Sequence, residues 1–230
     1  MAEVEAHEPF WPTVRGSSSK IPACTHNDRV PESTAAPLLT ERFAAAFTFA
    51  WEVHGRQLRK KTRVPYIAHV MAVCSLALEH GADEDVAIAA LLHDTIEDSE
   101  DGAATQRRIG QDFGPRVAAI VTACSDTIAV PGEPKPPWKE RKERYLHHLA
   151  DDADQDALLV SACDKVHNAG SILTDLRAEG DQVWERFTVP DPHEQLWYYS
   201  SVTSILQRRL PGPLTEELAR MVQEIGAHVE

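Results

Sequence analysis

The stretch AIAALLHDTIED, residues 87–98, ends an apolar run with four ionisable side chains. The pair His93-Asp94 comes first, and the pair Glu97-Asp98 follows one turn later. Residues three and four apart are neighbours on a helix, so each member of the first pair is expected to lie beside one of the second. A helix that is apolar all round is buried. Because buried carboxylates are costly unless they are paired or bind a metal, the stretch predicts a metal site.

The remainder of the chain after residue 38 also reads as helices. Thr40 can cap the first of them, and Gly110 and Gly114 are expected to bracket a turn. Alternation of β-branched and aromatic residues, which indicates strands, is nearly absent. The sequence therefore predicts an all-α fold, a compact multi-helix bundle with the metal site between core helices. Its other helices are expected near residues 66–80, 84–98, 115–125, 156–176, 193–209 and 214–227.

Residues 1–38 differ in composition from the rest of the chain. They contain five prolines among serines and threonines, without hydrophobic periodicity. Such a segment cannot easily bury enough apolar surface to fold alone. We therefore expect a disordered Pro/Ser-rich tail over residues 1–38, followed by one domain over residues 39–230.

Composition excludes several classes of partner. The formal net charge of -13 argues against a nucleic-acid polymer, because phosphate backbones recruit basic surfaces. The four cysteines are far apart, with no CxxC pair, which favours free thiols in a reducing compartment. No apolar run approaches the ~20 residues of a membrane span, and the acidic N-terminus does not resemble an export signal. We expect a cytoplasmic protein without a membrane partner, for which a homo-oligomer stays open.

Two further polar residues stand in apolar surroundings. His69 ends the segment VPYIAH, and Asp164 follows the run LLVSAC. With His93 and Asp94 they form a set of two imidazoles and two carboxylates. This set suits a divalent ion such as Mn²⁺, Fe²⁺ or Zn²⁺, whereas Ca²⁺ prefers oxygen ligands alone. A lone core histidine is commonly just hydrogen-bonded, but His, then His-Asp, then Asp in three apolar helices favours a metal site.

The order of these residues resembles the HD-domain phosphohydrolases, named for their His-Asp pair. It is most similar to the hydrolase domain of the RelA/SpoT stringent-response enzymes and to the stand-alone small alarmone hydrolases. The resemblance covers about residues 41–206, and no synthetase motif follows, so we expect a hydrolase that stands alone. The motifs that carry it are Arg59-Lys60, PYIAH (65–69), ALLHDTIED (90–98), FG (113–114), ERK (140–142) and DKVHN (164–168).

The resemblance implies a reaction and a set of roles. The reaction is hydrolysis of the 3′-pyrophosphate of (p)ppGpp to GDP or GTP and pyrophosphate. Glu97 and Asp98 are the implied acid–base pair, although taken alone they could be a solvated helix end. The implied cofactor is one Mn²⁺, with Fe²⁺ or Zn²⁺ as alternatives. Its implied ligands are His69, His93, Asp94 and Asp164.

A substrate with several phosphates also needs cations. Basic residues cluster at 56–63 and at 135–144, although either cluster alone could be a solvated face. The resemblance places base or phosphate contacts on Arg59 and Lys60, because an arginine can stack on a base or bind phosphate through two nitrogens. It places a phosphate-contacting segment on Arg141 and Lys142. Asn168 lies one turn after the Asp of DKVHN and is expected to face the same site.

Other polar and aromatic residues are expected to have structural roles. His54 should pack or form a hydrogen bond near the rim of the site, and Lys165 should form an ion pair behind the metal ligands. His147-His148 lies beside an acidic run and should be exposed. The cluster Trp197–Tyr199 should anchor a late helix in the core. None of these residues is assigned a catalytic role.

Two alternative functions stay open. In the turn Lys61–Val64, two charged residues stand where the family usually has a small residue, so the identity of the base rests on analogy. The same chemistry could act on another nucleotide, as a ppApp hydrolase or an NADPH 2′-phosphatase. A non-catalytic nucleotide-binding module is the other alternative, and the intact carboxylates Glu97 and Asp98 argue against it.

Overall fold

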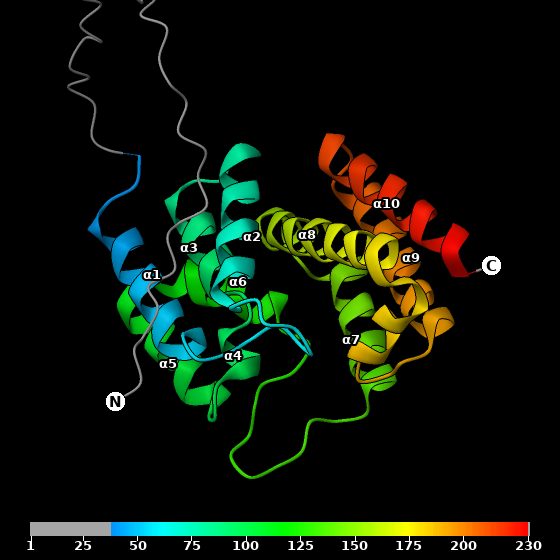
Figure 1. Ribbon diagram of the computed structural model, residues 1–230. Coiled ribbons are helices and arrows are strands. Elements are labelled where there is room, and N and C mark those ends of the chain that lie inside the picture. Colours follow the sequence, from blue (N-terminus) through cyan, green and yellow to red (C-terminus); the bar gives the residue numbers. More distant parts are fainter. Residues whose placement is uncertain (1–37, 230) are drawn as a thin grey trace, which may run out of the picture. The chain divides into compact units, whose positions relative to one another are not determined.

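The computed structural model describes residues 38–229, and within them it consists of helices and connecting segments (Figure 1). The predicted all-α fold class is confirmed. One isolated bridge between Leu58 and Pro65 is the sole β interaction of the described residues. The elements are α1 (Glu41–His54), α2 (Ile67–Glu79), α3 (Glu84–Leu92), α4 (Thr95–Asp98), α5 (Gly102–Phe113), α6 (Pro115–Cys124), α7 (Trp138–Asp151), α8 (Gln155–Glu179), the 3-10 helix η1 (Gly180–Arg186), α9 (Pro192–Arg209) and α10 (Pro213–Val229).

The expected tail falls, apart from Leu38, outside the described residues. Among the helices that are described, none is both long enough and apolar enough to cross a membrane.

Side-chain caps determine where several helices begin. The hydroxyl of Thr40 accepts a hydrogen bond from the backbone N–H of Arg42 at 3.2 Å, so the predicted cap is confirmed. An N-cap typically stabilises a helix by about 1 kcal/mol. Aspartates cap four further helices in the same way: Asp83 caps α3, Asp101 caps α5, Asp154 caps α8 and Asp191 caps α9. Helices α3 and α8, which lead to or carry site residues, therefore start at fixed positions.

Helix α3 lies in the centre of the core. Each residue from Val86 to Leu92 is at most 3% exposed, and the helix contacts α1, α2, α6 and α8. This burial agrees with the prediction from its uniformly apolar sequence. Because α3 is held from several sides, the residue after it, His93, enters the interior at a fixed position.

Two local predictions were wrong. The stretch from residue 84 to residue 98 is two helices, because the backbone of Asp94 turns at φ -96° and ψ -4° between α3 and α4. The hydroxyl of Thr95 donates to the carbonyl of Leu92 at 2.6 Å and so satisfies a group that the interruption leaves free. The expected turn between Gly110 and Gly114 is also absent, since Gly110 lies inside α5 and only Gly114, at φ +96°, ends that helix.

Helix α8 connects the two halves of the described region. It contacts α2, α3 and α6 on one side and η1, α9 and α10 on the other. In Figure 1 it runs across the middle of the molecule, between α2 and the α9–α10 pair. A helix in this position can present site residues to both halves.

A substitution of Gly102 tests how closely the start of α5 packs against α4 and the segment around Ala129. A Cβ on Gly102 would lie 2.6 Å from the backbone nitrogen of Ala129 and 2.7 Å from the carbonyl oxygen of Ile96. Gly102→Ala must therefore shift backbone, and we expect a loss of about 1–3 kcal/mol in the free energy of unfolding. The matched control is Gly110→Ala on the same helix, whose Cβ would meet only the Cβ of Ala118, at 3.7 Å. This control should gain about 0.5–1 kcal/mol. Urea unfolding measures both, and equal stabilities would contradict the packing described.

Candidate metal centre and substrate cavity

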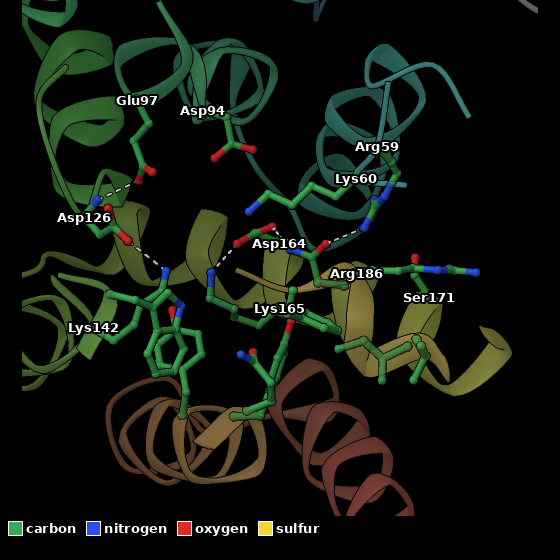
Figure 2. Close-up of a pocket in the computed structure, with 18 of the residues that line it drawn as sticks. Arg59, Lys60, Asp94, Glu97, Asp126, Lys142, Asp164, Lys165, Ser171 and Arg186 are labelled. Atoms are coloured by element: carbon green, nitrogen blue, oxygen red, sulfur yellow. Dashed lines mark hydrogen bonds and ion pairs between the residues drawn. The ribbon is translucent and has the colours of Figure 1, made fainter. Parts of the chain in front are cut away.

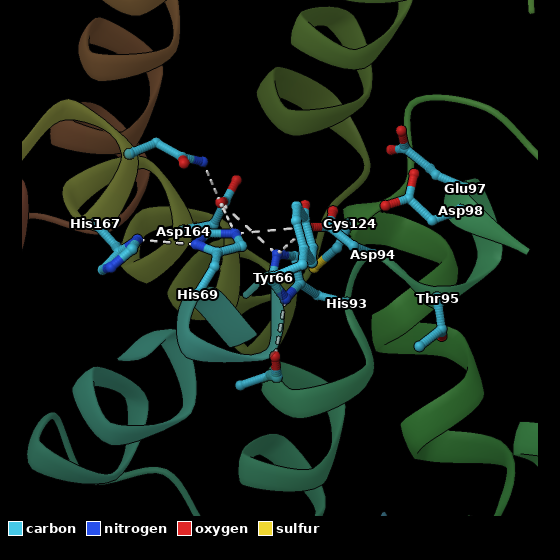
Figure 3. Close-up of polar contacts among 12 residues, drawn as sticks. Tyr66, His69, His93, Asp94, Thr95, Glu97, Asp98, Cys124, Asp164 and His167 are labelled. Atoms are coloured by element: carbon cyan, nitrogen blue, oxygen red, sulfur yellow. Dashed lines mark hydrogen bonds and ion pairs between the residues drawn. The ribbon is translucent and has the colours of Figure 1, made fainter. Parts of the chain in front are cut away.

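Four side chains from three parts of the fold converge on one point (Figure 3). His69 comes from α2, His93 and Asp94 lie at the junction of α3 and α4, and Asp164 comes from α8. The Nε2 atom of His69 is 3.5 Å from Asp94 Oδ2 and 3.2 Å from Asp164 Oδ1. The Nε2 atom of His93 is 3.0 Å and 3.7 Å from the same two oxygens. The structure thus brings together the four residues that the sequence analysis selected.

The histidine tautomers fit a metal ion. The Nδ1 atom of His93 lies 2.8 Å from the carbonyl oxygen of Ala90, to which it can only donate. That bond leaves a lone pair on Nε2, which is buried and has no hydrogen-bond partner among the described residues. Metal-binding histidines are commonly oriented by such a bond from the other ring nitrogen. The His69, His93 and Asp94 group is therefore a candidate site for a divalent ion.

The electrostatics of this group also favour a cation. Burial alone would lower the pKa of His93, but the carboxylates of Asp94 and Asp164 raise it well above its usual value. Burial would raise the pKa of Asp94, but His93 and His69 hold it well below its usual value. Positive charge between these carboxylates is therefore strongly stabilised.

A second layer of residues fixes the four side chains. The hydroxyl of Tyr66 donates to Asp94 Oδ2 at 2.5 Å. Asn168 Nδ2 donates to Asp164 Oδ1, also at 2.5 Å, and Lys165 forms an ion pair with the other oxygen, as expected. Since Lys165 is buried, this pair keeps Asp164 charged inside the protein.

His167 completes this layer behind His69. Its Nδ1 atom lies 2.8 Å from Nδ1 of His69 and 3.2 Å from Nη1 of Arg59. Burial, together with the neighbouring His69 and Arg59, lowers the pKa of His167 to about 4. A neutral His167 can accept a hydrogen bond from the N–H at Nδ1 of His69, so the lone pair of the His69 ring lies on Nε2, which faces the carboxylates.

Glu97 and Asp98 lie side by side on α4 (Figure 3). Glu97 lines the same cavity as Asp94, and its carboxylate accepts a hydrogen bond from the backbone N–H of Asp126 at 2.7 Å. Burial, followed by the charges of Asp126 and Asp94, raises the pKa of Glu97 to about 7. Lys135 Nζ lies 3.8 Å from Glu97 and 3.7 Å from Asp98. A carboxyl group with a pKa near 7 can both take and give a proton at neutral pH.

A cavity of about 300 Å³ adjoins this cluster (Figure 2). Helix α8 forms one wall of it, with residues from Asp164 to Asp175 that recur at helical spacing. Acidic residues of the wall lie beside the candidate metal site, and its basic residues suit an anionic ligand. These basic residues are Arg59, Lys60, Lys142, Lys165 and Arg186.

Most, but not all, of the residues predicted to contact the substrate line the cavity. Arg59 lines it and donates to Asn168 Oδ1 at 2.7 Å, which joins it to the Asp164 side. Lys60 lines it as well, and burial lowers its pKa. Lys142 lines the cavity, whereas Arg141 does not. Arg141 instead pairs with Asp126.

Asp126 is the main site residue that the sequence analysis missed. It follows α6, is 7% exposed, and its carboxylate pairs with both Arg141 and Lys142. Two adjacent cations at the start of a helix that packs on the core need a buried carboxylate partner, and this requirement was the available signal. Tyr66 lies within the PYIAH motif and could have been found there, whereas no signal pointed to Arg186 at the far end of the cavity.

The metal site can be tested at Asp164. We expect Asp164→Ala to lose the ion, but it also leaves Lys165 without its partner, and breaking a buried pair costs about 3–5 kcal/mol. Asp164→Asn keeps the shape and should still lower the affinity for a divalent ion by more than about 10-fold. Calorimetric titration with Mn²⁺ measures this, with the exposed Asp112→Asn as the control. Wild-type affinity in Asp164→Asn would contradict the proposed ligand set.

The raised pKa of Glu97 makes stability depend on pH. The protonated form is favoured in the folded state, so its contribution is complete below the ordinary value of 4.5 and is lost as the pH rises to about 7. Glu97→Gln is neutral and can still accept the N–H of Asp126. Without metal, this variant should be more stable than wild type at pH 8, by on the order of 1–3 kcal/mol, and should lose this advantage near pH 4.5. Urea unfolding in a chelator measures the difference, and a less stable variant at pH 8 would contradict the burial of Glu97.

Comparisons with known proteins identify the family of the chain. A family model described as "HD domain" matches residues 46–190. A Xenopus tropicalis protein named guanosine-3′,5′-bis(diphosphate) 3′-pyrophosphohydrolase MESH1 is 34% identical over 162 residues, which are 69% of this chain and 80% of that protein. The Danio rerio protein of the same name is 31% identical over 197 residues, 84% of this chain and 96% of that protein.

Longer relatives and solved structures are also similar. An Aquifex aeolicus guanosine-3′,5′-bis(diphosphate) 3′-pyrophosphohydrolase is 34% identical over 137 residues, 59% of this chain, which spans only 18% of that protein's length. A structure described as "A metazoan ortholog of SpoT hydrolyzes ppGpp and plays a role in starvation responses" has a TM-score of 0.64 at 24% identity, and covers 84% of this chain and 98% of that one. At that identity it supports the fold. The resemblance stated from the sequence is confirmed: the chain belongs to the HD-domain family, and it is similar to the proteins named MESH1 along most of their length.

Proposed function

We propose that this chain is a metal-dependent hydrolase that removes the 3′-pyrophosphate of (p)ppGpp and leaves GDP or GTP. The observation that carries the proposal is a single cavity that joins a metal-binding cluster, a carboxyl group with a pKa near 7 and several cations. The named activity of the relatives that match along most of their length supports this substrate.

The proposed cofactor is one Mn²⁺, with Fe²⁺ or Zn²⁺ as alternatives. The mixed nitrogen and oxygen donors suit ions of this type. When bound, such an ion neutralises phosphate charge and lowers the pKa of water. His69, His93, Asp94 and Asp164 would hold it.

Glu97 and Asp98 are proposed to move the proton of the reaction. Hydrolysis breaks the bond between the 3′ oxygen and phosphorus: the hydroxyl of water goes to phosphorus and its proton goes to the 3′ oxygen. Glu97, whose pKa is raised to about 7 mainly by burial, can accept the proton from water and return it to the departing oxygen. Asp98 lies beside it on α4 and would be the second member of this acid–base pair, acting on the same water.

The cavity cations are proposed to bind the phosphates and the base. Lys60 and Lys142 line the cavity and would contact phosphate oxygens. Arg59, held by Asn168, would bind the base or a phosphate. Arg141 lies behind the wall and would act through Asp126, which it shares with Lys142.

A panel of nucleotides tests the proposed substrate. With Mn²⁺ we expect pyrophosphate from ppGpp and pppGpp, and loss of that activity in a chelator and in Asp164→Asn. The panel also contains ppApp, NADPH and a simple 5′-nucleotide, with products separated by chromatography. Orthophosphate from NADPH alone would overturn the substrate while keeping the metal chemistry. Metal binding without turnover of any nucleotide would favour a binding module.

The division of roles within the site is tested by Glu97→Gln and Asp98→Asn. Both variants should bind Mn²⁺ as wild type does, because neither residue is a proposed ligand. Their kcat should fall by about 10²–10⁴-fold, the usual contribution of a general acid or base. Asp112→Asn removes an exposed carboxylate on α5 and should leave kcat unchanged. Loss of the metal in Glu97→Gln or Asp98→Asn would show that the roles are assigned wrongly.

A further inference from the structure

We propose that Gln57 is a positioning residue for Asp98, held in place by the buried His54. This inference rests on the proposed function, since it concerns the acid–base pair of that reaction. Gln57 lies between α1 and α2; it is not a proposed metal ligand, and it is not one of the residues that line the described cavity.

The amide of Gln57 bridges two side chains. Its Nε2 atom donates to Asp98 Oδ2 at 2.8 Å, and its Oε1 atom lies 2.6 Å from Nδ1 of His54. A carboxylate can only accept, so the amide nitrogen must face Asp98 and the amide oxygen must face His54. The bridge therefore has one direction, in which His54 donates to Gln57 and Gln57 donates to Asp98.

The buried end of the bridge is fixed by its surroundings. His54 is 0% exposed, and its Nε2 atom has no hydrogen-bond partner among the described residues. A proton on Nε2 would have no acceptor there, so the ring proton belongs on Nδ1, where Gln57 accepts it. The ring of His54 also packs against Tyr66, with ring centroids 5.0 Å apart.

The backbone of Gln57 is fixed as well. Its N–H donates to the carbonyl of His54 at 2.9 Å, and its carbonyl accepts from the N–H of Tyr66 at 2.8 Å. Tyr66 in turn donates from its hydroxyl to Asp94. The segment that orients Asp98 is thus tied to the residue that orients a proposed metal ligand.

Asp98 needs this support because little else holds it. Its side chain is 23% exposed and sits on a helix of four residues. In the described part of the chain, Gln57 is its one side-chain hydrogen-bond donor, and the half-exposed Lys135 lies 3.7 Å away. A proton-transfer group that can rotate loses its alignment with the reacting water.

The test is a double-mutant cycle on ppGpp hydrolysis. Gln57→Leu keeps the volume of the side chain and removes both hydrogen bonds; we expect kcat to fall about 10–100-fold, with KM and Mn²⁺ affinity unchanged. In the Asp98→Asn background the same substitution should change kcat by less than about 2-fold, because the group that it positions is already lost. Gln57→Glu keeps the acceptor for His54 but places a carboxylate against Asp98, so it should be no better than Gln57→Leu.

The control is Gln106→Leu, which removes a glutamine that donates to Thr122 outside the site, at 2.8 Å; its kcat should match wild type. A wild-type kcat in Gln57→Leu would overturn the inference. An equal fall in both backgrounds would also overturn it, since that result indicates a general structural role. A wild-type chain that releases no pyrophosphate from ppGpp would instead contradict the proposed function.

Discussion

The structure depends on compensating two carboxylates inside a helical core. Asp94 and Asp164 meet there with two imidazoles, and their pKa values stay well below the usual range although burial opposes this. Isolated buried charges would cost far more than a domain's net stability. Lys165, Asn168 and Tyr66 each contribute a bond to one of the two carboxylates. Because both carboxylates need these partners, α2, α3 and α8 must lie where their side chains can meet.

Around this group, the interruption between α3 and α4 separates two tasks. The proposed metal ligands His93 and Asp94 lie at the end of the buried α3, whereas Glu97 and Asp98 lie on the short α4. The first pair is held by the core, and the second by bonds from Asp126 and Gln57. Substitutions behind α4 can therefore alter proton transfer while leaving the affinity for the ion intact.

The sequence was sufficient for the features that depend on local pattern. The uniformly apolar run before His93 predicted a buried helix, and the order of His69, His93, Asp94 and Asp164, with the family resemblance that this order carries, predicted a shared metal site. The sequence was not sufficient to predict contacts in which one polar atom joins two segments that are far apart in the chain. Nothing near Gln57 in the chain indicates that its amide reaches Asp98. The interruption of the helix at Asp94 was missed because the hydrophobic pattern of the sequence is the same whether or not the backbone of one residue departs from helical geometry.

Helix α8 gives the cavity a fixed length. Asp164, beside the proposed metal, and Asp175, which pairs with Arg186, line the same cavity from one helix. At 1.5 Å per residue their backbones are separated by roughly 16 Å. An α-helix does not change its length to suit a ligand. A molecule can therefore contact both ends of this wall only if the distance from its reactive phosphate to its other end matches the distance between Asp164 and Asp175. This requirement on length applies to a molecule that contacts both ends, whichever base it carries.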